Sequence, residues 1–138
     1  MDTDRIDELH AAALAVQQHA YAPYSNYRVG AAVLTASGRI FAGCNVENAA
    51  YPQGACAEAG AIAAMVAAGE REIVAVLTVT DGEMLGTCCG GCRQRIREFA
   101  ALDVPIYAAD GNGVRMTFTL ADLLPHSFGP DHLGRPSG

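Results

Sequence analysis

Residues 73–94 read IVAVLTVTDGEMLGTCCGGCRQ, and they combine the pattern of a buried strand with that of a helix. The first eight, Ile73 to Thr80, form a nearly continuous apolar run rich in valine, which is typical of a strand at the centre of a sheet. Asp81-Gly82 ends this run. After a short loop, Gly90 to Ala100 predict a helix that buries one side, with Cys89 at its start.

The flanking sequence predicts further helices and strands around this unit. Apolar residues at spacings of three and four over residues 5–20 predict an amphipathic helix, with Thr3 or Asp4 as its N-cap. Because helices alternate with strands after a hairpin, we expect a single domain over residues 1–138, an α/β fold with one mixed sheet and helices on its faces. The other expected elements are strands 28–35 and 39–44 joined by 36–38, helix 55–68 ending at Gly69, strands 104–108 and 114–117, helix 119–124, loops 22–26 and 45–54, and an irregular tail after Pro125.

Composition excludes several classes of protein. With 138 residues, 51 % hydrophobic and 17 % charged, the chain is expected to be globular and not disordered. Its net charge of −6 argues against nucleic-acid binding, and we assign Arg95 and Arg97 to a solvated helix face. No apolar run approaches a membrane span, and the acidic start does not resemble a secretory leader. We therefore expect a cytoplasmic protein with reduced cysteines.

Two short segments supply a set of groups suited to zinc chemistry. Cys56-Ala57-Glu58 and the pair Cys89 and Cys92 together offer three thiolates and one carboxylate. Three protein ligands leave the fourth position of a tetrahedral zinc open, which is typical of a catalytic site. A carboxylate beside that position can move protons to and from a bound water, as in the zinc-deaminase signature. The sequence therefore predicts Zn²⁺ on the three cysteines, with Glu58 as general acid and base.

Both segments are expected at helix starts, where free N–H groups lower thiol pKa values and offset thiolate charge. Residues i and i+2 of a regular helix do not share a face. Cys56 must therefore lie at the cap, outside helical geometry, if Glu58 is to reach the same centre. Gly54 makes such an irregular entry easier.

Other interpretations of the cysteines stay open at this point. A C-x-x-C pair at a helix start is also typical of thiol-redox sites. Cys44 or Cys88 could complete a closed, structural four-thiolate zinc site. A buried thiol suits Cys44 better, and Cys88 is too close to Cys89 to bind beside it easily. We expect four histidines to be surface or local hydrogen-bonding groups: His10, His19, His126 and His132.

Four residues outside these segments could contact a ligand. Asn45 and Glu47 lie in the predicted loop before Cys56, where they could serve the turn itself or bind a polar ligand such as a sugar. Tyr27 and Phe128 are aromatic, and such residues more often belong to a core than to a ligand site.

The chain resembles the small homotetrameric cytidine deaminases over almost its whole length. The residues that carry the resemblance are Ala22-Pro-Tyr-Ser-Asn-Tyr-Arg-Val-Gly-Ala-Ala32, Gly43-Cys-Asn-Val-Glu-Asn-Ala49, Cys56-Ala-Glu58, Cys89-Gly-Gly-Cys-Arg-Gln94, Leu123-Leu-Pro125 and Phe128-Gly-Pro130. The resemblance implies a three-layer α/β/α sandwich around a five-stranded mixed sheet. It also implies hydrolytic deamination of cytidine and 2′-deoxycytidine, with attack on C4 and Glu58 as the proton shuttle, as part of pyrimidine salvage.

The resemblance further implies which residues meet the substrate. Asn45 and Glu47 would bind the ribose hydroxyls, and the backbone of Ala57 would contact the pyrimidine. Tyr27 would line the nucleoside pocket. Phe128 would stack on the base in a neighbouring subunit, so active sites would be shared within a homotetramer.

The chain departs from the family pattern near the cysteines. Ala59 stands where the family usually has an arginine that helps to neutralise the thiolates, Cys88 stands where it has proline, and Tyr27 replaces the more usual phenylalanine. Within the same fold, a deaminase of a cytosine-containing antibiotic such as blasticidin S is the alternative function. A non-catalytic structural zinc module is the alternative from another class.

Overall fold

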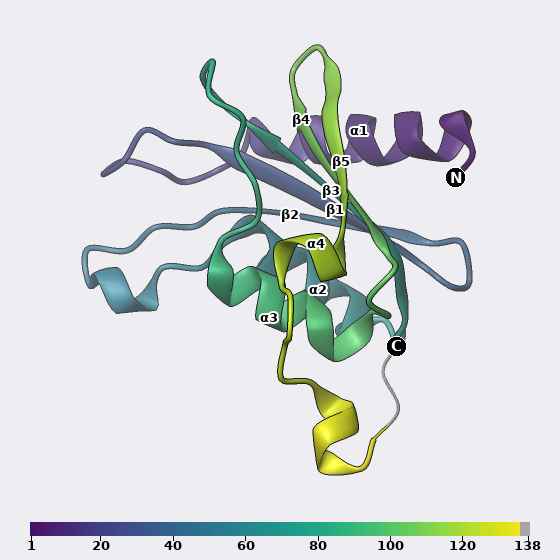
Figure 1. Cartoon of the computed structure of the whole chain (residues 1–138). Helices are drawn as coiled ribbons and strands as arrows, with labels where there is room; N and C mark the ends of the chain where they lie inside the picture. Colours follow the sequence, from purple (N-terminus) through teal and green to yellow (C-terminus); the bar gives the residue numbers. More distant parts are fainter. Residues whose placement is uncertain (136–138) are drawn as a thin grey trace.

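The computed structural model describes residues 1–135 as a three-layer α/β/α sandwich around one mixed five-stranded sheet (Figure 1). The strand order is β2-β1-β3-β4-β5; β3 and β4 run parallel, and the other neighbours are antiparallel. The strands are β1 (Val29–Thr35), β2 (Ile40–Cys44), β3 (Ile73–Thr80), β4 (Pro105–Asp110) and β5 (Gly113–Thr119). The expected fold class is confirmed.

The helices divide between the two faces of the sheet. Leu9 and Ala13 of α1 pack with Leu77 and Val79 of β3 on one face, whereas α2 and α3 pack with Val76 on the other. The helices are α1 (Thr3–Gln17), α2 (Ala57–Ala67), α3 (Gly90–Phe99), α4 (Leu120–Leu123) and the 3₁₀ helices η1 (Tyr51–Gln53) and η2 (Pro130–Leu133). Seven of the eight residues of β3 are buried, which confirms its expected central place.

Helix α2 lies directly against β2 because Gly43 has no side chain. A Cβ atom at Gly43 would meet the backbone nitrogen of Ala61 at 2.4 Å, so any other residue would push α2 away. At its other end α2 stops at Gly69, as the sequence predicts, with a positive φ of 89°. The N–H of Glu70 then donates a hydrogen bond to the carbonyl of Met65 at 3.1 Å. These two glycines set the position and the length of the helix that carries Cys56.

Several element boundaries differ from the sequence-based expectation. Helix α1 is capped by Asp2, whose side chain accepts from the N–H of Asp4 at 2.9 Å, and not by Thr3 or Asp4. It ends three residues before residue 20, and β5 extends to Thr119. The loop 45–54 contains η1 and the tail contains η2, and each of these 3₁₀ helices has a proline in its first turn.

The tail is ordered by an arginine that the sequence-based interpretation placed in solvent. Arg97 is only 2 % exposed. Its guanidinium donates to Ser127 Oγ at 2.8 Å and to Asp131 Oδ1 at 2.9 Å. A Cβ atom at Gly129 would lie 2.2 Å from Cζ of Arg97, so the tail can pass over Arg97 only with glycine there. The expectation of a solvated Arg97 is therefore wrong, because α3 is covered by the C-terminal segment.

None of the helices within residues 1–135 combines the length and the apolar character needed to cross a bilayer.

Candidate metal centre and active site

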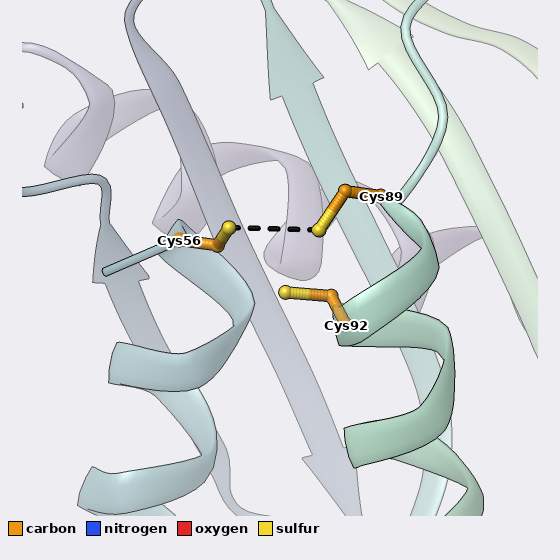
Figure 2. A group of neighbouring side chains, drawn as sticks. All are labelled: Cys56, Cys89 and Cys92. Atoms are coloured by element: carbon orange, nitrogen blue, oxygen red, sulfur yellow. Dashed lines mark hydrogen bonds between the residues drawn. The ribbon is translucent and has the colours of Figure 1, made fainter. Parts of the chain in front are cut away.

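Three thiols converge where the starts of α2 and α3 face each other (Figure 2). The Sγ atoms of Cys56, Cys89 and Cys92 all lie within 4.8 Å of one another, and those of Cys56 and Cys89 are 3.6 Å apart. Zinc–sulfur bonds of about 2.3 Å in tetrahedral geometry place sulfurs about 3.8 Å apart. The cluster therefore fits a zinc ion, and all three predicted metal ligands are brought together.

The two helix caps explain how the cluster forms. Cys56 is the N-cap of α2 and Cys89 the N-cap of α3, and both have extended backbone dihedrals. This confirms the expectation that Cys56 lies outside regular helical geometry. Neither thiol makes a capping hydrogen bond, so both side chains are free to point toward Cys92 in the first turn of α3. The cap positions also let Glu58 approach the same centre.

A helix N-terminus is expected to lower the pKa of a nearby thiol, but of the three clustered thiols only Cys89 has a lowered pKa. Burial and the neighbouring thiol of Cys89 raise the pKa of Cys56, and burial and the charge of Glu58 raise that of Cys92. The pKa of Cys89 is lowered despite its partial burial, because the backbone N–H of Cys92 and two thiols donate to it. Burial thus outweighs the effect of the helix N-terminus on the pKa of Cys56 and of Cys92.

Glu58 lies in the first turn of α2 and is only 4 % exposed. Burial raises the pKa of its carboxyl, while the thiol of Cys88 and the charge of Arg95 oppose that rise. A carboxyl with a raised pKa is better matched to both accepting and releasing a proton near neutral pH. Glu58 lines the same cavity as Cys56 and Cys89.

The cavity has a volume of about 420 Å³ and extends from the cysteines to the loop after β2. Asn45 and Glu47 line it at that loop, Tyr27 forms part of its wall, and Ala57 lines it beside the cysteines. The size and the polar groups at both ends suit a nucleoside-sized ligand.

Asn45 and Glu47 are both held rigidly by backbone groups. Asn45 Oδ1 accepts from the N–H of Val29, and its Nδ2 donates to the carbonyl of Tyr27, both at 2.8 Å. Glu47 accepts from the N–H groups of Tyr24 and Ser25 at 2.9 and 3.1 Å and from the Ser25 hydroxyl. The hydroxyl and these N–H groups lower the pKa of Glu47, which keeps it ionised. Each side chain still has a free N–H or lone pair for a ligand.

Phe128 is not among the residues that line this cavity, and its side chain is 58 % exposed. Its ring stacks on His132 with centroids 4.9 Å apart, and Gln94 Nε2 donates to its carbonyl at 2.8 Å. The structure thus presents Phe128 outward on an ordered tail. It does not bring Phe128 into the site of the same chain.

Sequence reasoning did not single out Thr78, and it assigned Cys88 no contact at the site. Thr78 lies in β3, 2 % exposed, and lines the cavity. Its Oγ1 is the one buried side-chain polar atom within residues 1–135 that lacks a protein hydrogen-bond partner. The available signal was two threonines, Thr78 and Thr80, in an otherwise apolar central strand. Cys88, which the sequence places too close to Cys89 to bind metal beside it, is buried and interacts with Glu58.

Neither proposed fourth ligand joins the cluster. In the described part of the chain, the group that could hold a metal contains Cys56, Cys89 and Cys92, without Cys44, Cys88 or any histidine. The buried carboxyl of Glu58, which lines the same cavity as Cys56 and Cys89, also leaves less support for a plain redox pair. The arrangement favours a three-cysteine site over a closed one.

We expect Cys44→Ser to retain one zinc per chain, because Cys44 ends β2 and lies outside the cluster. Zinc content of the purified variant, measured against wild type, checks this. Loss of the metal in Cys44→Ser would mean that the site is closed by a fourth thiolate.

Comparison with known proteins gives a consistent result. The family model described as cytidine and deoxycytidylate deaminase zinc-binding region matches residues 3–108. A cytidine deaminase of Sporosarcina psychrophila is 39 % identical over 128 residues, covering 93 % of this chain and 94 % of that protein. A Mycobacterium tuberculosis cytidine deaminase is 39 % identical over 116 residues, covering 84 % of each.

Solved structures agree with this sequence similarity. The crystal structure of cytidine deaminase from Burkholderia pseudomallei matches with a TM-score of 0.82 at 39 % identity, covering 88 % of this chain and 98 % of that one. The Mycobacterium leprae enzyme matches with a TM-score of 0.72 at 41 % identity, covering 87 % and 97 %. The matched zinc-binding region contains all three clustered cysteines, and this chain belongs to the cytidine deaminase family.

Proposed function

We propose that this protein, as a single domain over residues 1–138, hydrolyses cytidine and 2′-deoxycytidine to uridine and 2′-deoxyuridine with release of ammonia. The observation that carries the proposal is one cavity lined by two thiols of the three-cysteine cluster, by the buried carboxyl of Glu58 and by the fixed pair Asn45 and Glu47. The thiols and the carboxyl suit attack on an aminopyrimidine, and the fixed pair suits a sugar.

Zinc bound by Cys56, Cys89 and Cys92 would supply Lewis acidity that makes water a nucleophile near neutral pH. Glu58 would accept the proton of the attacking water. It would pass that proton to the ring nitrogen next to C4, and it would then carry the proton of the new C4 hydroxyl to the departing amino group. Water adds at C4, the C–N bond breaks, and the proton balance closes through this one carboxyl.

The remaining residues would orient the nucleoside. Glu47, ionised and held by Ser25, would accept hydrogen bonds from ribose hydroxyls, and Asn45 would use its remaining N–H or lone pair. The backbone of Ala57 would contact the pyrimidine edge, and Tyr27 would form the wall beside the ring.

We assign the exposed Phe128 to the active site of a neighbouring subunit in a homotetramer. Support comes from its 58 % exposure on a tail that Arg97 and Gln94 hold in place, away from its own cavity. An apolar ring that is exposed yet held rigidly suits stacking on a base across an interface.

Mixed oligomers test this sharing of sites. We expect co-expressed Glu58→Gln and Phe128→Ala chains to form oligomers more active than the sum of the two separate variants. Some mixed sites would combine an intact Glu58 with an intact Phe128 from the partner. Activity no greater than that sum, in oligomers shown to contain both chains, would contradict the assignment.

The substrate is tested by following ultraviolet absorbance with purified, zinc-loaded protein. We expect turnover of cytidine and 2′-deoxycytidine, with blasticidin S a poorer substrate because it cannot use the Asn45 and Glu47 end in the same way. Preference for blasticidin S would favour the antibiotic deaminase instead, and inertness toward all three would favour a structural zinc module. Thiolate ligands require a reducing environment, and we place the enzyme in cytoplasmic pyrimidine salvage.

A further inference from the structure

The starts of α2 and α3 offset only part of the negative charge at the metal centre, and the segment Cys56-Ala57-Glu58 contains no cationic side chain. Three thiolates and one Zn²⁺ sum to −1, and an ionised Glu58 adds a further negative charge. An excess of negative charge makes the ion a weaker Lewis acid. The residue after Glu58 is Ala59, which carries no charge.

Arg95 brings a positive charge to the cluster from the adjacent helix. It follows Cys92 by three residues on α3, so both side chains lie on the same face. Its Nη1 is 3.5 Å from Sγ of Cys92 and donates to that sulfur. Arg95 also acts on Glu58, where its charge opposes the rise in pKa that burial causes. One guanidinium therefore reaches both negatively charged components of the site.

Gly91 provides the space for this conformation. A Cβ atom at Gly91 would lie 3.3 Å from Nη1 of Arg95, so the guanidinium passes close over the first turn of α3. Side chains in a helix point toward its N-terminus, and this direction brings the guanidinium of Arg95 to the end of α3 where the cysteines lie.

Arg93 does not compete for this role, because its guanidinium donates to two backbone carbonyls and one hydroxyl away from the three thiols. Its guanidinium donates to the carbonyls of Cys88 and Leu123, both at 2.7 Å, and to Thr87 Oγ1 at 2.8 Å. For Arg95, by contrast, the hydrogen bond to Cys92 is the one recorded within residues 1–135.

We propose that Arg95 is a positioning residue for the metal centre, whose guanidinium donates to the Cys92 thiolate and supplies the positive charge that position 59 lacks. Charge-assisted hydrogen bonds are about twice as strong as neutral ones, so this contact strengthens when Cys92 ionises on metal binding. The role needs a cation near sulfur and does not need contact with substrate. Arg95 accordingly does not line the cavity.

Variants that separate charge from shape test the proposal. Arg95→Gln removes the charge, Arg95→Lys keeps it, and Arg71→Gln is the matched control beyond the far end of α2. Zinc affinity is measured by competition with a chromophoric chelator, without substrate. Residues that support metal ligands typically affect affinity or activity by about 10–100-fold. We expect about tenfold weaker zinc binding in Arg95→Gln, substantial recovery in Arg95→Lys, and no change in Arg71→Gln.

Steady-state kinetics of the zinc-saturated proteins give the second readout. We expect kcat of Arg95→Gln to fall about tenfold with KM within about twofold, because the ion loses Lewis acidity while the cavity is unchanged. Unchanged zinc affinity in Arg95→Gln, or an equal loss in Arg95→Lys, would overturn the proposal. Since Arg95 is exposed, the thermal stability of the zinc-loaded Arg95→Gln protein should fall by no more than its weaker zinc binding accounts for. The zinc measurement stands even if the substrate assignment fails.

Discussion

The Glu58→Gln variant is expected to retain one zinc per chain while kcat for cytidine falls by about 10²–10⁴-fold, the usual contribution of a positioned acid–base group. Glutamine has the same shape but cannot carry a proton between water, ring and leaving group. The fold should tolerate the change, because burial already raises the pKa of the Glu58 carboxyl and glutamine removes that desolvated charge. Zinc content and steady-state kinetics on the same preparation check both parts.

Glu98→Gln is the matched control. It is the same substitution at an exposed residue of α3 that does not line the cavity. It should keep both zinc and activity. Deamination at the wild-type rate in Glu58→Gln would remove Glu58 from the reaction. Loss of zinc from Glu58→Gln would instead make Glu58 a metal ligand.

Cys89→Ser should weaken zinc binding by more than about a hundredfold. Mutation of a residue that only hydrogen-bonds to a metal ligand already lowers metal affinity by about 10–100-fold. Serine keeps the size of the side chain but does not offer a thiolate to the ion. Cys89 is the most informative ligand to change, because it is exposed at the cap of α3 whereas Cys92 is buried in the core. The variant should therefore fold and lose activity with its metal.

Zinc content and activity of Cys89→Ser are compared with those of Cys44→Ser, which removes one thiol outside the cluster. Only the first variant should lose metal. Activity that survives full metal loss in Cys89→Ser would separate the reaction from zinc altogether.

The architecture was predictable because its signals are local. The apolar run Ile73 to Thr80 indicated the central strand, and Gly69 indicated the end of α2. The three ligands and Glu58 followed from spacing, since C-x-E and C-x-x-C leave few arrangements around one ion. Even the cap position of Cys56 followed, because a regular helix could not bring Cys56 and Glu58 to one centre.

What the sequence did not reveal depends on contacts between distant segments. Arg97 looks like a surface residue on its helix and is buried only because Ser127 and Asp131 cover it. The raised pKa of Cys92 arises from burial, and the spacing of the cysteines in the sequence does not indicate how deeply they are buried. Arg95 reaches the cluster through a side-chain conformation, and its sequence position alone equally suits a solvated face.

X-ray absorption at the zinc edge tests most directly whether the metal keeps an open position. We predict three sulfur ligands at about 2.3 Å and one light atom at about 2.0 Å, with Cys56, Cys89 and Cys92 as the sulfur donors. Four sulfur ligands would contradict the account, because a saturated ion leaves no place for water beside Glu58.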